Sequence, residues 1–110
     1  MEYQSYSRHG YHVLKFSEDL VFGTHLGELE DTVMNLLGKG ITKIALAFTR
    51  HSMLYSKNVA VLVKCLEIIK DRGGELVIVG PSDSFKTALQ AVHFEDLAKV
   101  CDTEEELATA

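Results

Sequence analysis

The sequence predicts an α/β domain with a mixed central β-sheet of about four to five strands and about four helices. Short apolar runs, suited to buried strands, alternate with longer segments whose apolar residues recur every three or four positions. Glycines at 38–40 and 73–74 separate two of these helical segments from the strand that follows. The crossover from the strand at Lys43 through the long helix to the strand at Glu75 should be right-handed, which makes those strands parallel.

The first half of the chain contains a polar start, one or two strands and a helix. Residues 1–10 are polar and predict a flexible lead-in, so the folded domain would span residues 11–110. Residues 12–16 alternate weakly and predict a strand, with residues 19–22 as its candidate partner. A helix is expected from Thr24, because apolar residues then recur at helical spacing: Leu26, Leu29, Val33, Leu36 and Leu37.

The second half has clearer signals. Residues 41–48 are the best strand candidate, a nearly continuous apolar run suited to the centre of a covered sheet. A long helix at 56–72 and a buried strand at 75–79 follow. Pro81 and Ser82 begin a turn into a third helix, and a short strand at 98–101 precedes a final helix. Asp102 and Glu105 have the spacing of a capping box for that last helix.

Composition limits the functional class. The net charge of -5 argues against nucleic-acid binding, which needs clustered basic residues. No apolar run approaches the roughly 20 residues of a membrane span, and the start of the chain lacks the pattern of a signal peptide. Cys65 and Cys101 have no paired spacing and are expected to be free thiols in a reducing compartment. We therefore expect a cytoplasmic protein without membrane insertion.

The sequence contains no arrangement typical of an enzyme or a cofactor site. Five histidines are scattered, and the close pair His9 and His12 has no carboxylate at ligand spacing, so we expect no metal. Gly-rich phosphate loops and the common hydrolase motifs are absent. The acidic run at Glu28, Glu30 and Asp31 is interpreted as a solvated helix face. We expect a non-enzymatic protein that needs no cofactor.

The long helix at 56–72 has two unusual features. Lys57 lies in its first turn, where the helix dipole disfavours a cation by about 0.3–1 kcal/mol. Its apolar residues form two adjacent stripes, Val59/Leu62/Leu66/Ile69 and Val61/Cys65/Ile68, which together are wider than a surface helix usually needs. Either the helix is enclosed between the sheet and a neighbouring helix, or part of this face near its start contacts a partner.

The order of elements and several local sequences resemble STAS domains, the anti-sigma factor antagonists of bacteria. The resemblance runs from about Tyr11 to Leu107 and is strongest from Ile41 to Val79, where strand, loop, helix and "GGELVIV" follow the family order. The tail "FEDLAKVCDTEEELATA" resembles the family ending of a short strand and an acidic helix. The resemblance implies a STAS-like fold.

The family motif is an Asp-Ser-Ser-Gly or Asp-Ser-Thr-Gly quartet at the start of the long helix, whose third residue is phosphorylated by a partner kinase. The resemblance places Tyr55, Ser56, Lys57 and Asn58 at these positions, so only Ser56 is retained. Lys57 has no hydroxyl to phosphorylate. The resemblance thus implies a divergent domain not phosphorylated at this position.

Serine side chains near the motif leave a question open. Ser56, Ser52 and Ser84 are alternative phosphate acceptors, although for Ser56 we favour the role of helix N-cap, worth about 1 kcal/mol.

Three functions remain open. The first is a protein-interaction module that binds a regulatory partner, for example a kinase-type anti-sigma factor. The second is a STAS subunit of a stress-signalling scaffold or a transporter-associated complex, and the third is a nucleotide or small-ligand sensor. A homodimer is also left open. The candidate partner-binding residues lie in the loop and helix start at 52–59: Ser52, Tyr55, Ser56, Lys57, Asn58 and Val59.

Overall fold

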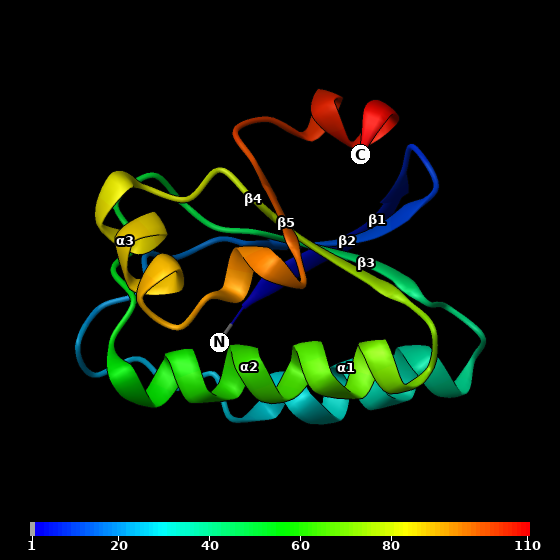
Figure 1. The fold of residues 1–110 in the computed structure, drawn as a ribbon, viewed down its shortest axis with the longest axis horizontal. Helices are drawn as coiled ribbons and strands as arrows, with labels where there is room; N and C mark the ends of the chain where they lie inside the picture. Colours follow the sequence, from blue (N-terminus) through cyan, green and yellow to red (C-terminus); the bar gives the residue numbers. More distant parts are fainter. Residues whose placement is uncertain (1) are drawn as a thin grey trace.

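A five-stranded sheet with the order β1-β2-β3-β4-β5 forms the centre of the computed structural model, which describes residues 2–110. The described residues also form three α-helices and two 3-10 helices, η1 and η2 (Figure 1). In chain order the elements are β1 (Tyr3–Arg8), β2 (Tyr11–Phe16), α1 (Glu28–Gly38), β3 (Lys43–Ala47), α2 (Ser56–Asp71), β4 (Glu75–Val79), α3 (Asp83–Ala91), η1 (Phe94–Asp96), β5 (Lys99–Cys101) and η2 (Glu104–Thr109). The α/β class and mixed sheet predicted from the sequence are confirmed.

Four of the strands are parallel, and the helices connect them. β2, β3, β4 and β5 run parallel, while β1 pairs antiparallel with β2. The parallel pairing of β3 with β4, with Lys43 opposite Glu75, confirms the crossover prediction. Figure 1 shows α1 and α2 lying side by side beneath the sheet, with η2 at its other face.

The central strands are buried on both faces, which explains their nearly continuous apolar sequence. One face packs on the helices through a large core cluster that includes Leu14, Ile44, Leu46, Leu62 and Ile78. The opposite face is a smaller cluster closed by η2, whose members are Tyr11, Val13, Ala45, Ala47, Val77, Val79 and Leu107.

The amino-terminal segment differs from its prediction. Residue 1 lies outside the described part, but Tyr3–Arg8 form the edge strand β1 instead of a flexible lead-in. A two-residue turn at His9 and Gly10 joins β1 to β2, with φ of 52° and 84°. Positive φ at both positions is the hairpin turn that matches strand twist. Because β1 is exposed and polar, no apolar alternation marked it in the sequence.

Three other boundaries also differ. β1 takes the place beside β2 that was predicted for residues 19–22, which form no strand. The first helix begins at Glu28, four residues after the predicted Thr24. The last helix is a 3-10 helix, and the backbone N–H of Asp102 donates to Glu106 at 3.4 Å, so the capping partner is not Glu105.

Candidate functional site

The start of α2 is bonded to a loop that lies far from it in the sequence. The loop between β2 and α1, residues 17–27, is held at two points, one by the segment that leads into α2 and one by the first turn of α2. At the first point, the backbone N–H of Leu20 donates to Ser52 Oγ at 2.9 Å, and the N–H of Met53 donates to the Leu20 carbonyl at 2.8 Å. Leu20 is itself fully buried, so this attachment fixes one end of the loop in the core.

Asn58 makes the second attachment. Its Nδ2 donates to the Thr24 carbonyl at 2.9 Å, and its Oδ1 accepts from the backbone N–H of Leu26 at 3.2 Å. The side chain is 1% exposed. In the resemblance Asn58 stands at a family glycine, and asparagine tolerates unusual backbone angles better than most residues. The structure shows a different use, because Asn58 is helical and its amide secures the loop.

Between these two points the loop presents an apolar tip. Val21 and Phe22 are 54% and 75% exposed, and a tight turn holds them, because the N–H of Thr24 donates to the Val21 carbonyl at 2.9 Å. The Phe22 ring packs edge-on against Tyr55, with the ring centroids 5.3 Å apart. Met53 is 45% exposed, and its sulfur accepts from the Tyr55 hydroxyl at 3.7 Å.

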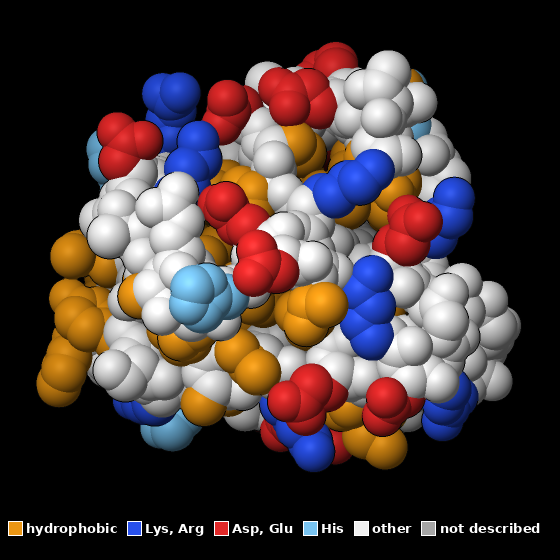
Figure 2. All heavy atoms as spheres, in the orientation of Figure 1, with side chains coloured by type: hydrophobic (Ala, Val, Ile, Leu, Met, Phe, Trp, Pro, Cys, Tyr) orange, Lys and Arg blue, Asp and Glu red, His pale blue; other side chains and the backbone are white. Residues whose placement is uncertain are grey.

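We call Val21, Phe22, Met53 and Tyr55 the aromatic patch. Figure 2 shows hydrophobic side chains protruding from the edge of the molecule at which α2 begins in Figure 1. Exposed apolar side chains that gather in this way usually mark interaction surfaces.

Lys57 and Ser56 lie exposed beside this patch. No carboxylate lies within 4 Å of Lys57 among the described residues, so its charge faces solvent. Tyr55, not Ser56, is the N-cap residue of α2, and Ser56 makes no capping bond. The expected capping role of Ser56 is therefore wrong, because its backbone is already in the helix.

The predicted site residues form two groups: buried residues that position the loop, and residues at the molecular surface. Ser52 is fully buried, where its Oγ also contacts Thr49 Oγ1 at 2.6 Å and its carbonyl accepts from Ser82 Oγ at 3.0 Å. Ser52 and Asn58 therefore position the loop and cannot touch a partner directly. Tyr55, Ser56, Lys57 and Val59 remain at the surface, while Ser84, the other alternative acceptor, is exposed on α3.

A groove between α2 and α3 continues from the patch. Its volume is about 570 Å³, and its lining is mostly apolar, including Leu54, Val59, Ala60, Val63, Ala88 and Val92. Leu62, Cys65, Leu66 and Ile69 of α2 are buried in the core. The wide apolar face of α2 is thus largely enclosed, and its residual part lines this groove.

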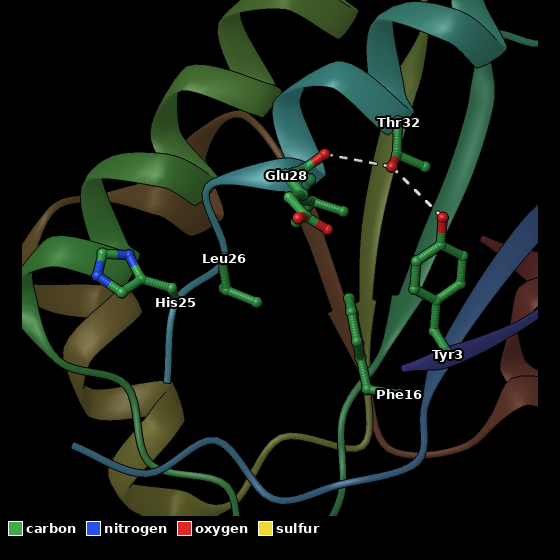
Figure 3. A pocket seen from close by; sticks show the side chains of 7 residues that line it. Tyr3, Phe16, His25, Leu26, Glu28 and Thr32 are labelled. Atoms are coloured by element: carbon green, nitrogen blue, oxygen red, sulfur yellow. Dashed lines mark hydrogen bonds between the residues drawn. The ribbon is translucent and has the colours of Figure 1, made fainter. Parts of the chain in front are cut away.

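A small pocket and the two thiols offer little chemistry. Figure 3 shows a small pocket near the start of α1, in which Tyr3 of β1 reaches toward Thr32 of α1, with their hydroxyls 3.4 Å apart. Its volume of about 30 Å³ suits only something near the size of water. Burial raises the pKa of the Cys65 thiol to about 12 and that of Cys101 to about 11, which keeps both protonated. Within residues 2–110 no group of three or more side chains is arranged to hold a metal ion.

The expected absence of a membrane span concerns the helices of residues 2–110. None of the helices in the described chain combines the length and hydrophobicity that crossing a bilayer requires.

Comparison with known proteins identifies the family. The sequence model of the STAS domain matches residues 2–107, and the chain therefore belongs to the STAS domain family. An NMR structure of the protein TM1081 is similar to it with a TM-score of 0.77 and 21% identity, covering 96% of this chain and 85% of that one. A crystal structure of TM1081 from Thermotoga maritima, named as a provisionally assigned anti-sigma factor antagonist, gives 0.75 and 20%, covering 94% and 89%.

These likenesses establish the fold. Curated proteins gave no match to this chain.

Sequence reasoning missed the half of the surface that comes from the loop. Phe22 was assigned to a strand, and nothing local marks it as exposed. The available signal was two polar residues, Ser52 and Asn58, placed next to an apolar segment. Buried polar side chains need hydrogen-bond partners, and the apolar segment could supply its backbone groups.

Proposed function

We propose that this chain is a protein-interaction domain that binds a regulatory partner through the aromatic patch and the exposed side of the start of α2. The observation that best supports this proposal is the exposure of Phe22. This large apolar side chain is three-quarters exposed on a loop that is bonded to the core at Leu20 and Leu26. A fixed loop loses little conformational entropy on binding, so its apolar area contributes to affinity. No catalysis is invoked.

The partner chemistry follows from the surface. An apolar ring or aliphatic side chain would pack against Phe22 and Tyr55, and an acidic group would pair with Lys57, which has no carboxylate partner of its own among residues 2–110. The adjoining groove between α2 and α3 extends the apolar area. A kinase-type anti-sigma factor, which the family membership suggests, is the partner class we favour.

We further propose that this interaction is not switched by phosphorylation at position 57. Lysine offers no hydroxyl, and its charge is opposite in sign to that of a phosphate. Binding would then be controlled by protein level or by another input.

The first test is an affinity pull-down from the source cells with the folded domain, followed by measurement of the dissociation constant for the partner recovered. Phe22→Ala and Lys57→Asp should each weaken binding by about tenfold or more. Truncation of a central aromatic hot spot costs about 2 kcal/mol or more, and reversal of the Lys57 charge places two like charges against each other at an acidic partner. Leu97→Ala is the matched control. Leu97 is 60% exposed and lines a hollow with Lys70, at the opposite end of α2.

The outcomes are distinct. Equal binding by all four proteins would contradict the proposed surface. Recovery of a scaffold or transporter ATPase, with the same variants weakened, would keep the surface and change the partner to a larger assembly.

The phosphorylation proposal has a separate test. Wild type incubated with a family-type serine kinase should take up no phosphate at residue 57, whereas Tyr55→Asp with Lys57→Ser restores the acceptor and its neighbouring acid. Phosphate on the double variant alone would support loss of the acceptor, and phosphate on wild-type Ser56 would contradict an unswitched surface.

A further inference from the structure

The strand β1 is an unprotected edge of the sheet. Its only neighbour among the described strands is β2, so half of its backbone groups face outward. Proteins usually guard such edges with very short strands, lysine, proline or bulges. The opposite edge, β5, follows this rule, with three residues that begin at Lys99. β1 has six residues, continuous pairing with β2 and a single charge, on Arg8.

The register of the hairpin determines which groups of β1 face outward. The N–H of Ser17 donates to the Glu2 carbonyl at 3.2 Å, so the backbone of Glu2 points toward β2. Backbone direction alternates along an antiparallel strand, so Gln4, Tyr6 and Arg8 also bond to β2. The N–H and carbonyl groups of Tyr3, Ser5 and Ser7 therefore point away from the sheet.

We propose that two copies of this chain pair antiparallel through β1, with the two-fold axis at Ser5. The two five-stranded sheets would then form one continuous sheet of ten strands. Only pairs between outward-facing residues can exchange backbone hydrogen bonds. An axis at Ser5 uses all of them, because Ser5 then faces Ser5 of the second copy and Tyr3 faces Ser7.

The register also determines which side chains would face each other. In a two-fold interface each contact occurs twice, so the strand must complement itself. An axis at Ser5 places Glu2 of each copy opposite Arg8 of the other, on the same face, and Gln4 opposite Tyr6. Arg8 already donates to Glu104 and Glu105 at 3.4 and 2.9 Å, so its charge is balanced within its own chain. The outward-facing backbone groups, and not the pairing of Glu2 with Arg8, therefore set the register.

The side chains of β1 nearest the axis are small or directed toward their own chain. The Ser5 side chain is small and bonds to its own His12 at 2.6 Å. Tyr3 leans over its own chain, with its ring edge-on to Phe16 and its hydroxyl beside Thr32, as Figure 3 shows. Ser5 and Ser7 are both exposed, so the edge is open to a second strand.

The test uses oligomeric state and a matched pair of cysteine variants. Sedimentation equilibrium of the wild-type chain should show twice the mass of one chain at high concentration, dissociating on dilution. Ser5→Cys and Ser7→Cys are then made in a Cys101→Ser background and oxidised. Across the axis the two copies of residue 5 would lie about 5.5 Å apart at Cα, within disulfide reach, whereas the two copies of residue 7 would be about 14 Å apart.

Ser5→Cys should therefore form the covalent dimer and Ser7→Cys should not. A covalent yield for Ser5→Cys no greater than that for Ser7→Cys overturns the register and the proposal with it. If the chain stays monomeric at every concentration, the proposed pairing is also overturned, and this edge would then be available to a strand of another protein. Circular dichroism of both variants checks that the fold is retained.

A further readout needs no cysteine. The amides of Ser5 and Ser7 should gain protection from hydrogen exchange as concentration rises, while those of Gln4 and Tyr6 are protected throughout. Unchanged exchange at Ser5 in a concentrated sample would contradict the pairing.

Discussion

At the residue scale, Asn58 shows how one buried amide can define a surface. It donates to the Thr24 carbonyl and accepts from the Leu26 N–H, and these bonds fix the position of the loop that exposes Phe22. Replacement by the family glycine removes both bonds and adds backbone freedom to the helix. We expect Asn58→Gly to lower the free energy of unfolding by about 2–4 kcal/mol.

Urea unfolding measures this loss, and Ser56→Gly, at an exposed helix position two residues earlier, is the control for glycine in the first turn. Equal losses in the two variants would mean that the Asn58 bonds contribute nothing measurable. A second readout is backbone exchange at Leu26, which should become faster in Asn58→Gly alone.

Tyr11 gives a residue-scale prediction about pH. Burial, followed by the hydrogen bond to Glu75 at 2.8 Å, raises the pKa of its hydroxyl to about 12 from the ordinary 10.0. Between these values the folded chain retains a proton that the unfolded chain has lost. This contribution is fully present below about pH 10, and it is lost as pH rises toward about 12.

Tyr11→Phe should therefore flatten the decline of unfolding free energy above about pH 10, in addition to costing about 1 kcal/mol for the lost hydrogen bond at neutral pH. Urea midpoints on both sides of about pH 10 measure the slope. Tyr6, whose pKa is also raised to about 12 by burial and Glu104, should behave similarly when changed to Phe. Slopes equal to wild type in both variants would exclude this linkage.

At the element scale, the junction between α2 and β4 depends on Gly74. A Cβ there would overlap the Thr42 carbonyl oxygen and lie 2.9 Å from Ile69 Cγ2. The N–H of Gly74 donates to the Ile69 carbonyl at 2.9 Å, so the backbone has little room to shift. We expect Gly74→Ala to cost about 1–3 kcal/mol of unfolding free energy.

Gly38, the last residue of α1, is the matched comparison. No heavy atom lies within 4 Å of a Cβ built there, and its φ is not positive. Gly38→Ala should therefore stabilise the protein by about 0.4–1 kcal/mol, by restricting the unfolded chain. Thermal and urea unfolding of the two variants should shift in opposite directions, and a shift in the same direction would contradict the packing at Gly74.

The elements that the sequence predicted well carry their signals locally. β3, α2 and β4 have apolar runs of the right length and glycines at their ends, so neighbouring residues suffice to assign them. β1 is a strand only because β2 pairs with it, and its exposed polar residues give no period. Phe22 is similar, because bonds from Ser52 and Asn58, both distant in sequence, determine its exposure.

At the scale of the whole molecule, the two proposed surfaces lie at different ends. Figure 1 places the β1–β2 turn at one end of the sheet and the start of α2 at the other. Pairing through β1 would therefore leave both aromatic patches of a dimer exposed. A dimer would offer a partner two copies of the same surface, which can raise its apparent affinity without any new contact.

The whole sheet also determines what the amino terminus does, and a deletion separates the two interpretations of that segment. A flexible lead-in could be removed without loss, but removal of residues 1–8 would take away β1 and expose the edge of β2. That deletion also removes Tyr6 and Arg8, which hold Glu104 of η2 by contacts of 2.7 and 3.4 Å. The face of the sheet that η2 covers would lose support.

We expect the deletion to lower the free energy of unfolding by several kcal/mol and to cause aggregation through the β2 edge, since unpaired strands are templates for association. Urea unfolding and light scattering measure these effects. Removal of Thr109 and Ala110 is the control, because both are exposed and Leu107, the buried residue of η2, is kept. Wild-type stability in the amino-terminal deletion would restore the lead-in interpretation, because β1 would then contribute nothing to the folded domain.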